Sequence, residues 1–362
     1  MNKTLGAWWQ RKFGNPEALV LISLLVGISV VIYWFGRILA PILVAVVLAY
    51  LLDWVVEALE GKGMPRHMAV MVVFVSFLAF LIWLVLVLLP LVWSQVEALS
   101  TEWPQWVQRG QLWIKNLPKD YPGIFTPELV ADLSRQMGGQ LGELGRLIVS
   151  ISLSSILNLA AIAVYMILVP LMVFFFLKDK HQILDWISKH LPRNRALAVR
   201  VWQEVDMQIG NYVRGKISEI LIVGSTSYFA FALLGLNYAL LLGVLVGLSV
   251  LIPYIGAAVV TVPVLVVGYL QWGGSSQFII LTVVYLVIQA LDGNVLVPIL
   301  FSEAVSLHPV AIIAAVLLFG GLWGFWGVFF AIPLATLVKA IINALEDGQV
   351  MEDEPLPDAA KQ

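Results

Sequence analysis

The stretch ILIVGSTSYFAFALLGLNYALLLGVLVGLSVLIPYIGAAVVTVPVLVVGYLQWGGSSQFIILTVVYLVIQAL, residues 220–291, decides the fold, because none of its 72 side chains is charged. A helix that crosses a bilayer needs about 20 mostly apolar residues, so the stretch is long enough for about three crossings. A soluble protein could not cover this much apolar surface, since its exposed face needs more polar side chains. The stretch therefore predicts membrane-spanning helices.

The rest of the chain has the same apolar character. Of its 362 residues, 60% are hydrophobic and only 12% are charged, which is about half the charged fraction of a typical soluble domain. The net charge of −2 gives no indication of a nucleic-acid partner. There is no cysteine, which excludes disulfides, thiolate metal sites and cysteine nucleophiles. We predict an all-α integral membrane protein that lies in the lipid bilayer.

Apolar runs of suitable length predict about eight transmembrane helices, some of them broken or re-entrant in the C-terminal half. The continuous spans are 18–35, 38–52, 69–92, 148–177, 220–236 and 278–300, and the broken segments are 239–270 and 309–345. Only Gly36 and Arg37 separate the first two spans, so we expect these spans to form a tight helical hairpin. The first apolar run is longer than that of a signal peptide and lacks a small-residue cleavage site, which favours a span.

Five regions are expected along the chain. They are N-terminal transmembrane helices (1–93), an extracytoplasmic amphipathic helical region (94–146), a transmembrane helix with a cytoplasmic amphipathic helix (147–218), a C-terminal transport core with broken helices (219–345) and a disordered cytoplasmic tail (346–362). The amphipathic segment 193–216 is typical of an interfacial helix that lies along an anionic leaflet. A role in gating or in subunit contacts is the alternative.

The distribution of basic residues predicts the sidedness. Lys and Arg near the spans number 13 on one side, from the N-terminus and from residues 53–68 and 178–218, and six on the other. Cytoplasmic loops carry the excess of Lys and Arg. Both termini are therefore predicted to be cytoplasmic, and residues 94–146 extracytoplasmic.

Glycine and proline interrupt two apolar segments of the C-terminal half. Pro253-Tyr254-Ile255-Gly256 divides residues 239–270 into pieces of about 14 residues, which are too short to span comfortably. Irregular backbone is not tolerated against lipid, so Pro253, Tyr254 and Gly256 are expected to line a cavity. A second interruption, in residues 309–345, contains Gly320, Gly321, Gly324 and Gly327. The segments are either re-entrant hairpins or full crossings, and the alternative for the second segment is that its glycines serve only close helix packing.

Polar side chains occur at membrane depth near residue 290. Gln289, Asp292 and Asn294 lie inside an otherwise apolar span, and the first two share a helical face. A lone carboxylate there costs a few kcal/mol unless it has partners or water. The functional interpretation is a site for a cation, a proton or a polar solute, and the alternative is a structural cap. Glu303 and His308 follow, and His308 either titrates near neutral pH or caps the next helix.

No constellation of an enzyme is present. Neither common Gly-rich nucleotide loop occurs, and the four histidines lack the spacing of a zinc site. We therefore expect no catalytic residue, no cofactor and no bound metal. Any uphill transport would have to use an ion gradient or another subunit.

The motifs of the C-terminal half resemble the autoinducer-2 exporter family. They are, in order, Pro253-Tyr254-Ile255-Gly256, Gln289-x-x-Asp292-Gly293-Asn294-x-x-x-Pro298, Leu307-His308-Pro309, Gly320-Gly321-x-x-Gly324-x-x-Gly327 and Ala331-Ile332-Pro333. Residues 291–333 look similar to the PerM-type permease subgroup. The resemblance covers essentially the whole membrane part. It implies a bacterial inner-membrane permease that forms homo-oligomers, with a pentamer as one expected size.

The residues and the resemblance together give one leading function and two alternatives. The leading hypothesis is a secondary transporter or permease that exports a small polar solute, and the resemblance implies the quorum-sensing furanone autoinducer-2. The alternative within the same class is a sodium(lithium)/proton antiporter, which Asp292 and Glu303 favour. The alternative from another class is a membrane scaffold without transport, which predicts a dry, closed path around Asp292.

Overall fold

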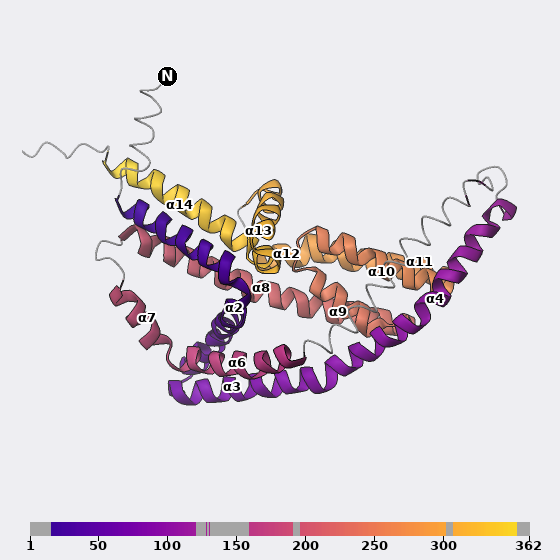
Figure 1. Cartoon of the computed structure of the whole chain (residues 1–362), viewed down its shortest axis with the longest axis horizontal. Coiled ribbons are helices and arrows are strands. Elements are labelled where there is room, and N and C mark those ends of the chain that lie inside the picture. Colours follow the sequence, from indigo (N-terminus) through magenta and orange to yellow (C-terminus); the bar gives the residue numbers. More distant parts are fainter. Residues whose placement is uncertain are drawn as a thin grey trace, which may run out of the picture.

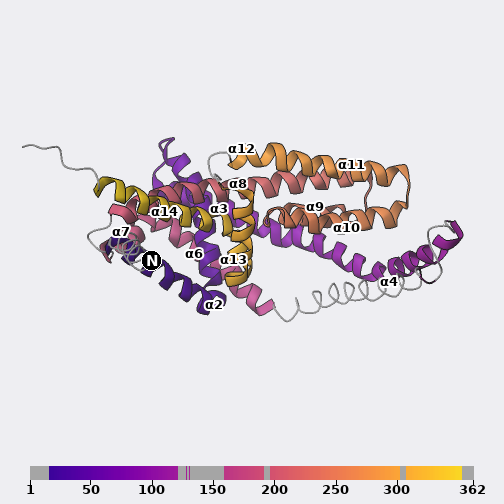
Figure 2. The ribbon, with the colours of Figure 1, turned by 90° about the horizontal axis from the view of Figure 1, so that it is seen from above.

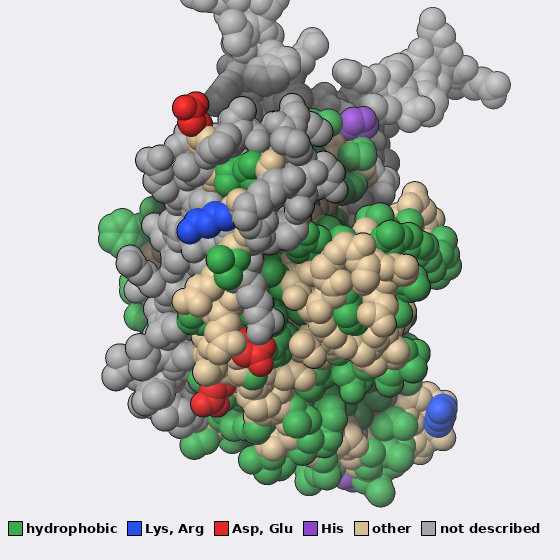
Figure 3. All heavy atoms as spheres, turned by 90° about the vertical axis from the view of Figure 1, so that its right-hand side faces the viewer, with side chains coloured by type: hydrophobic (Ala, Val, Ile, Leu, Met, Phe, Trp, Pro, Cys, Tyr) green, Lys and Arg blue, Asp and Glu red, His purple; other side chains and the backbone are tan. Residues whose placement is uncertain are grey.

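The structure is a computed structural model that describes residues 16–120, 128, 130, 159–190, 196–301 and 307–352. Every regular element in this part of the chain is a helix. Six of these helices are long and apolar enough to cross a membrane, and three shorter apolar helices accompany them. Many large hydrophobic side chains are exposed, and few charged ones interrupt the described surface in Figure 3. The prediction of an all-α membrane protein is confirmed.

The N-terminal helix differs from the prediction. The hairpin expected at Gly36 and Arg37 is wrong, because α2 (Pro16–Glu60) passes through both residues as one helix. A single glycine costs a helix only about 1 kcal/mol, which does not end it. Pro41 lies inside α2, where a proline bends a helix, and α2 changes direction along its length in Figure 1. Placing the N-terminus and residues 53–68 on the same side depended on that hairpin, so this part of the sidedness prediction loses its support.

The third predicted span is longer than expected. It consists of α3 (Arg66–Trp83), the π-helical turn η1 (Leu84–Leu88) and α4 (Leu89–Asp120). Together they form one curved rod along the lower edge of Figure 1. The first part of the predicted extracytoplasmic region is thus a continuation of a membrane helix. Most of the rest of that region, and residues 148–158 of the fourth span, lie outside the described residues.

Charged side chains join three helices at one end of the N-terminal half. The elements that follow α4 are α6 (Leu159–Lys178), α7 (Lys180–His190) and α8 (Ala196–Leu234). Asp53 pairs with Arg66 at 3.2 Å and also with Lys180. Lys180 pairs with Glu57 at 2.9 Å, and Arg66 pairs with Glu60 at 3.2 Å. We call these five side chains the junction cluster, because they connect α2 to the start of α3 and the start of α7.

Helix α8 is central to the described part of the molecule: one half runs beside α14, and the other half packs against α9 and α11 (Figures 1 and 2). The interfacial helix predicted for residues 193–216 is wrong over its second half, because that half is inside the protein. Tyr212 and Val213 are only 2% and 1% exposed, and the Tyr212 hydroxyl donates a hydrogen bond to Phe329 O at 3.1 Å. Helix α8 also passes without interruption through residues 218 and 219, where we expected the transport core to begin.

The first predicted break is confirmed. It lies between the first two of the next elements, which are α9 (Ala239–Ser249), α10 (Ile255–Trp272), α11 (Ser276–Leu291), the π-helical turn η2 (Asp292–Leu296) and α12 (Val297–Phe301). Tyr254 has a φ of 62°, in the left-handed region. A Cβ at Gly256 would lie 1.8 Å from Ser249 O, so only glycine permits this approach. The chain thus turns back on itself between α9 and α10.

The second predicted break is also confirmed, at Gly324. Gly324 lies within α13 (Pro309–Phe329) and has a φ of 59°. A Cβ at Gly327 would lie 1.8 Å from Phe319 O, so the two halves of α13 touch along their backbones. Helix α14 (Ala331–Glu352) follows and packs against α13 and α8. The glycines therefore serve both the break and the close packing, and whether either segment is re-entrant stays a prediction.

Candidate functional site

A cavity of about 400 Å³ lies between α8 and the break that separates α9 from α10. The other walls come from α11, η2 and α12, with single isoleucines from α13 and α14. The polar side chains that face it are Tyr212, Lys216, Glu219, Tyr254, Gln289 and Asp292. Segments far apart in the sequence therefore converge on one small polar space among apolar helices.

The carboxylate of Asp292 has an incomplete set of partners. Asp292 begins the π-helical turn η2, an irregularity that often occurs at functional sites. Gln289 faces the same cavity, as its three-residue spacing from Asp292 predicts. Asp292 Oδ1 is buried and forms no hydrogen bond. Buried polar atoms are normally paired, so this oxygen marks a position where a ligand group or a water completes the bonding.

A buried ion pair on α8 lines the same cavity. Lys216 Nζ lies 2.6 Å from Glu219 Oε2, and the two side chains are 5% and 3% exposed. The Lys216 ammonium also lies 5.3 Å from the centre of the Phe301 ring, a cation–π contact. If Lys216, Glu219 and Asp292 are all ionised, the cavity carries one excess negative charge. That balance favours a cation, a proton or a hydrogen-bond donor as its occupant.

Sequence reasoning missed Lys216 and Glu219 as site residues. It assigned Lys216 to a cytoplasmic segment and began the next span at the first uncharged position, residue 220. The signal was an opposite-charge pair, three residues apart, directly before the 72-residue uncharged stretch. Such a pair lies on one face of a helix that enters the membrane part.

A chain of hydrogen bonds ties Gln289 to α10. Gln289 Nε2 donates to the Tyr285 hydroxyl at 3.1 Å, and that hydroxyl lies 3.0 Å from Thr261 Oγ1. The Thr261 hydroxyl donates to Ala257 O at 2.7 Å, so Tyr285 is the donor toward Thr261. Because the amide nitrogen of Gln289 is used in this way, its carbonyl oxygen is left for the cavity. The wall at Gln289 and Asp292 therefore presents acceptor oxygens.

The other residues predicted from the sequence are only partly brought together. Pro253 and Tyr254 line the cavity, while Gly256 lies behind them at the close approach to Ser249. Asn294 is exposed and donates to Ala290 O of its own helix at 2.8 Å. His308 caps α13, and its Nδ1 accepts a hydrogen bond from Val310 N at 3.3 Å. Glu303 lies outside the described residues.

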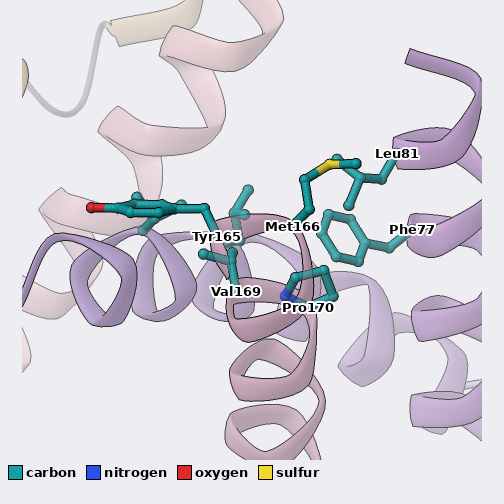
Figure 4. Close-up of a pocket in the computed structure, with 8 residues that line it drawn as sticks. Phe77, Leu81, Tyr165, Met166, Val169 and Pro170 are labelled. Carbon is teal, nitrogen blue, oxygen red and sulfur yellow. The ribbon is translucent and has the colours of Figure 1, made fainter. Parts of the chain in front are cut away.

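A second cavity contrasts with the first. It has a volume of about 450 Å³ and lies between α2, α3 and α6. Its lining is apolar apart from Tyr165, and Figure 4 shows Met166, Phe77 and Leu81 around a common space with the Tyr165 ring turned away. It offers no polar group to recognise a solute. Among the described residues there is also no group of three or more His, Asp or Glu that could hold a metal ion.

Several known proteins are similar in sequence to this chain over most of its length. The model of the AI-2E transporter family matches residues 22–347. A protein of Escherichia coli (strain K12) that is named as a permease, PerM, is 49% identical over 353 residues, which cover 98% of this chain and all of that one. Two proteins of Bacillus subtilis (strain 168) are named as transport proteins. YueF is 27% identical over 85% of this chain and 84% of its own, and YrrI is 26% identical over 90% and 93%. The chain, a multi-pass membrane protein, thus belongs to the AI-2E family of transporters.

Proposed function

We propose that the chain is a secondary transporter that exports a small polar solute through the cavity at Asp292, without nucleotide hydrolysis. The observation that carries the proposal is the buried, unpaired Oδ1 of Asp292 beside a space of about 400 Å³. Ligand sites in proteins typically have volumes of about 300–1,000 Å³ and a few convergent polar groups in an apolar wall. Ionisable groups at membrane depth commonly mark solute or ion pathways.

The furanone autoinducer-2, and with it a role in quorum sensing, is our proposed solute. It is small and rich in hydroxyl groups, and the acceptor oxygens of Gln289 and Asp292 suit hydroxyl donors. The name of the matching family supports this choice. We also propose a bacterial inner-membrane location with both termini cytoplasmic, and a homo-oligomeric assembly such as a pentamer.

Sodium/proton antiport is the second candidate. The excess negative charge of the cavity favours it, because one cation or one proton at Asp292 would neutralise that charge. A non-transporting scaffold is disfavoured, since it predicts a dry, closed path around Asp292 and a cavity is present there.

Transport by the purified full-length chain in liposomes tests the proposal. The furanone and sodium are each supplied on one side, with and without an imposed pH gradient. Furanone flux above that of protein-free liposomes supports export, and sodium flux driven by the pH gradient supports antiport. Liposomes with folded protein but neither flux would overturn both.

A further inference from the structure

Two acidic side chains and one basic side chain share the cavity, two of them from α8 and one from η2. Lys216 and Glu219 lie one turn apart on α8, and Asp292 begins η2. The ammonium of Lys216 pairs with Glu219 at 2.6 Å, while Asp292 Oδ1 has no hydrogen bond. The cavity therefore holds two carboxylates and one ammonium, and only Glu219 is paired with it, in a place where an unpaired charge is costly.

The packing of α8 against α12 keeps the ammonium near the helix that carries Asp292. A Cβ at Gly215 would lie 2.7 Å from Phe301 Cε1 and 3.2 Å from Leu300 O, so α8 touches the backbone of α12 directly beside Lys216. The ammonium lies over the Phe301 ring, and α12 continues directly from the turn that Asp292 begins. The lysine stem is flexible and its ammonium has three donors, only one of which Glu219 Oε2 uses.

We propose that Lys216 is a tethered competitor for Asp292. Its ammonium rests on Glu219, as in the structure. It moves across to Asp292 when that carboxylate is ionised and unoccupied, and it returns to Glu219 when a proton, a cation or a donor group of the solute occupies Asp292. This inference rests on the proposed function, because it takes Asp292 as the carboxylate that binds the transported group. It adds Lys216 as the residue that pairs with Asp292 again after the bound group has left.

A shared ammonium predicts opposite effects for its two neighbours. Without the charge of Lys216, Asp292 has no competitor and holds a proton to higher pH. Without the charge of Glu219, the ammonium has only Asp292 and the proton leaves at lower pH. The other titratable groups facing the cavity are Tyr212 and Tyr254, while α13 and α14 contribute only isoleucines. A purely structural ion pair would instead predict two similar losses of stability without opposite shifts.

The test follows the protonation of Asp292 directly. The full-length chain is reconstituted in liposomes without added solute and treated with dicyclohexylcarbodiimide over a pH series. This reagent modifies protonated carboxyl groups in apolar surroundings, and mass spectrometry of peptides locates the label. We expect the midpoint pH of labelling at Asp292 to rise by about one unit or more in Lys216→Met and to fall in Glu219→Gln. The matched control Lys180→Met, which removes a lysine from the junction cluster, leaves the midpoint unchanged.

Two results would overturn the inference: an unchanged midpoint in Lys216→Met, or shifts of the same sign in Lys216→Met and Glu219→Gln. If the methionine variant does not fold, Lys216→Gln takes its place, with the same upward shift expected. The proposed function fails separately. If Asp292→Asn transports normally while the opposite shifts are present, the shared ammonium stands and Asp292 is not the transport carboxylate. If Asp292→Asn abolishes transport but the two variants show no opposite shifts of the labelling midpoint, the proposed function stands and only the role of Lys216 is overturned.

Discussion

Two groups of acidic and basic side chains in the described part of the chain differ in their bonding. In the junction cluster, Asp53 pairs with Arg66 and Lys180, Glu57 pairs with Lys180, and Glu60 pairs with Arg66. The two cations are 23% and 32% exposed. In the cavity, Lys216 and Glu219 are 5% and 3% exposed, and Asp292 Oδ1 has no partner.

The difference separates a structural use of charge from a functional one. Every carboxylate of the junction cluster has a cation, and Arg66 also donates to Leu177 O of α6 at 3.1 Å, so the cluster joins the ends of four helices, α2, α3, α6 and α7. The cavity keeps a carboxylate oxygen unpaired beside open space, although pairing would be more stable. An unpaired carboxylate oxygen beside a cavity, rather than the presence of charge, distinguishes the candidate site. In the junction cluster every carboxylate is paired, and the buried atom without a partner is Arg66 Nε, whose terminal nitrogens bond to Glu60 and Asp53.

The largest effect on stability is expected at the wall of the cavity. In Gly256→Ala the new Cβ would lie 1.8 Å from Ser249 O, and backbone cannot yield as a side chain can. We expect the free energy of unfolding to fall by about 3 kcal/mol, which is at the upper end of the range for overpacked substitutions. Thermal unfolding in detergent measures it, with Gly321→Ala as the matched control, because nothing lies within 4 Å of that glycine. Equal melting temperatures for the two variants would contradict the tight turn.

A smaller loss of stability is expected when the junction cluster is broken. Asp53→Ala leaves Arg66 and Lys180 without their shared carboxylate. Breaking a fully buried pair costs about 3–5 kcal/mol, and the partial exposure of both cations reduces the expected loss to about 2 kcal/mol. Glu97→Ala, at an exposed position of α4, serves as the control and should change stability by about 0.5 kcal/mol at most. An unchanged stability of Asp53→Ala would contradict a structural role for the junction cluster.

The smallest effect is a pH dependence at Lys180. Burial alone would lower its pKa, but the hydrogen bonds to Asp53 and Glu57 outweigh burial and raise the pKa above 10.5. Because the pKa is higher in the folded than in the unfolded state, the stabilisation by the Lys180 ammonium is complete below pH 10.5. It is lost as the pH rises through the pKa of the folded state. We expect the loss to be about 0.5 kcal/mol, given solvent screening. Melting curves at alkaline pH should show it in the native chain but not in Lys180→Arg, which keeps its charge. Equal pH dependence of the melting temperature in the native chain and in Lys180→Arg would contradict this prediction.

The sequence predicts what depends on local chemistry and composition. The fold class follows from apolar runs, and the two breaks follow from proline and glycine, whose backbone preferences act wherever the chain lies. The shared cavity face of Gln289 and Asp292 follows from helical spacing alone.

The sequence does not predict what depends on packing between distant segments. Lys216 and Glu219 look like a polar helix end until α12 and α14 cover them. Asn294 has the composition of a site residue, yet it faces away and bonds to its own helix. The hairpin at Gly36 failed because a single glycine is too weak an interruption to end a helix, even where the side chains around it, such as Trp34 and Ile38, are exposed.

The central claim is that the unpaired carboxylate of the cavity carries transport, whereas the paired one of the junction cluster does not. Asp292→Asn and Asp53→Asn are matched changes, and transport per folded molecule and melting temperature are measured for both in the same liposome assay. Loss of a charge-assisted hydrogen bond worth about 1.5–3 kcal/mol predicts that Asp292→Asn reduces transport about ten- to hundredfold, with an unchanged melting temperature. Asp53→Asn should lower the melting temperature and leave transport per folded molecule intact. Unchanged transport and unchanged pH dependence in a folded Asp292→Asn variant would contradict the account.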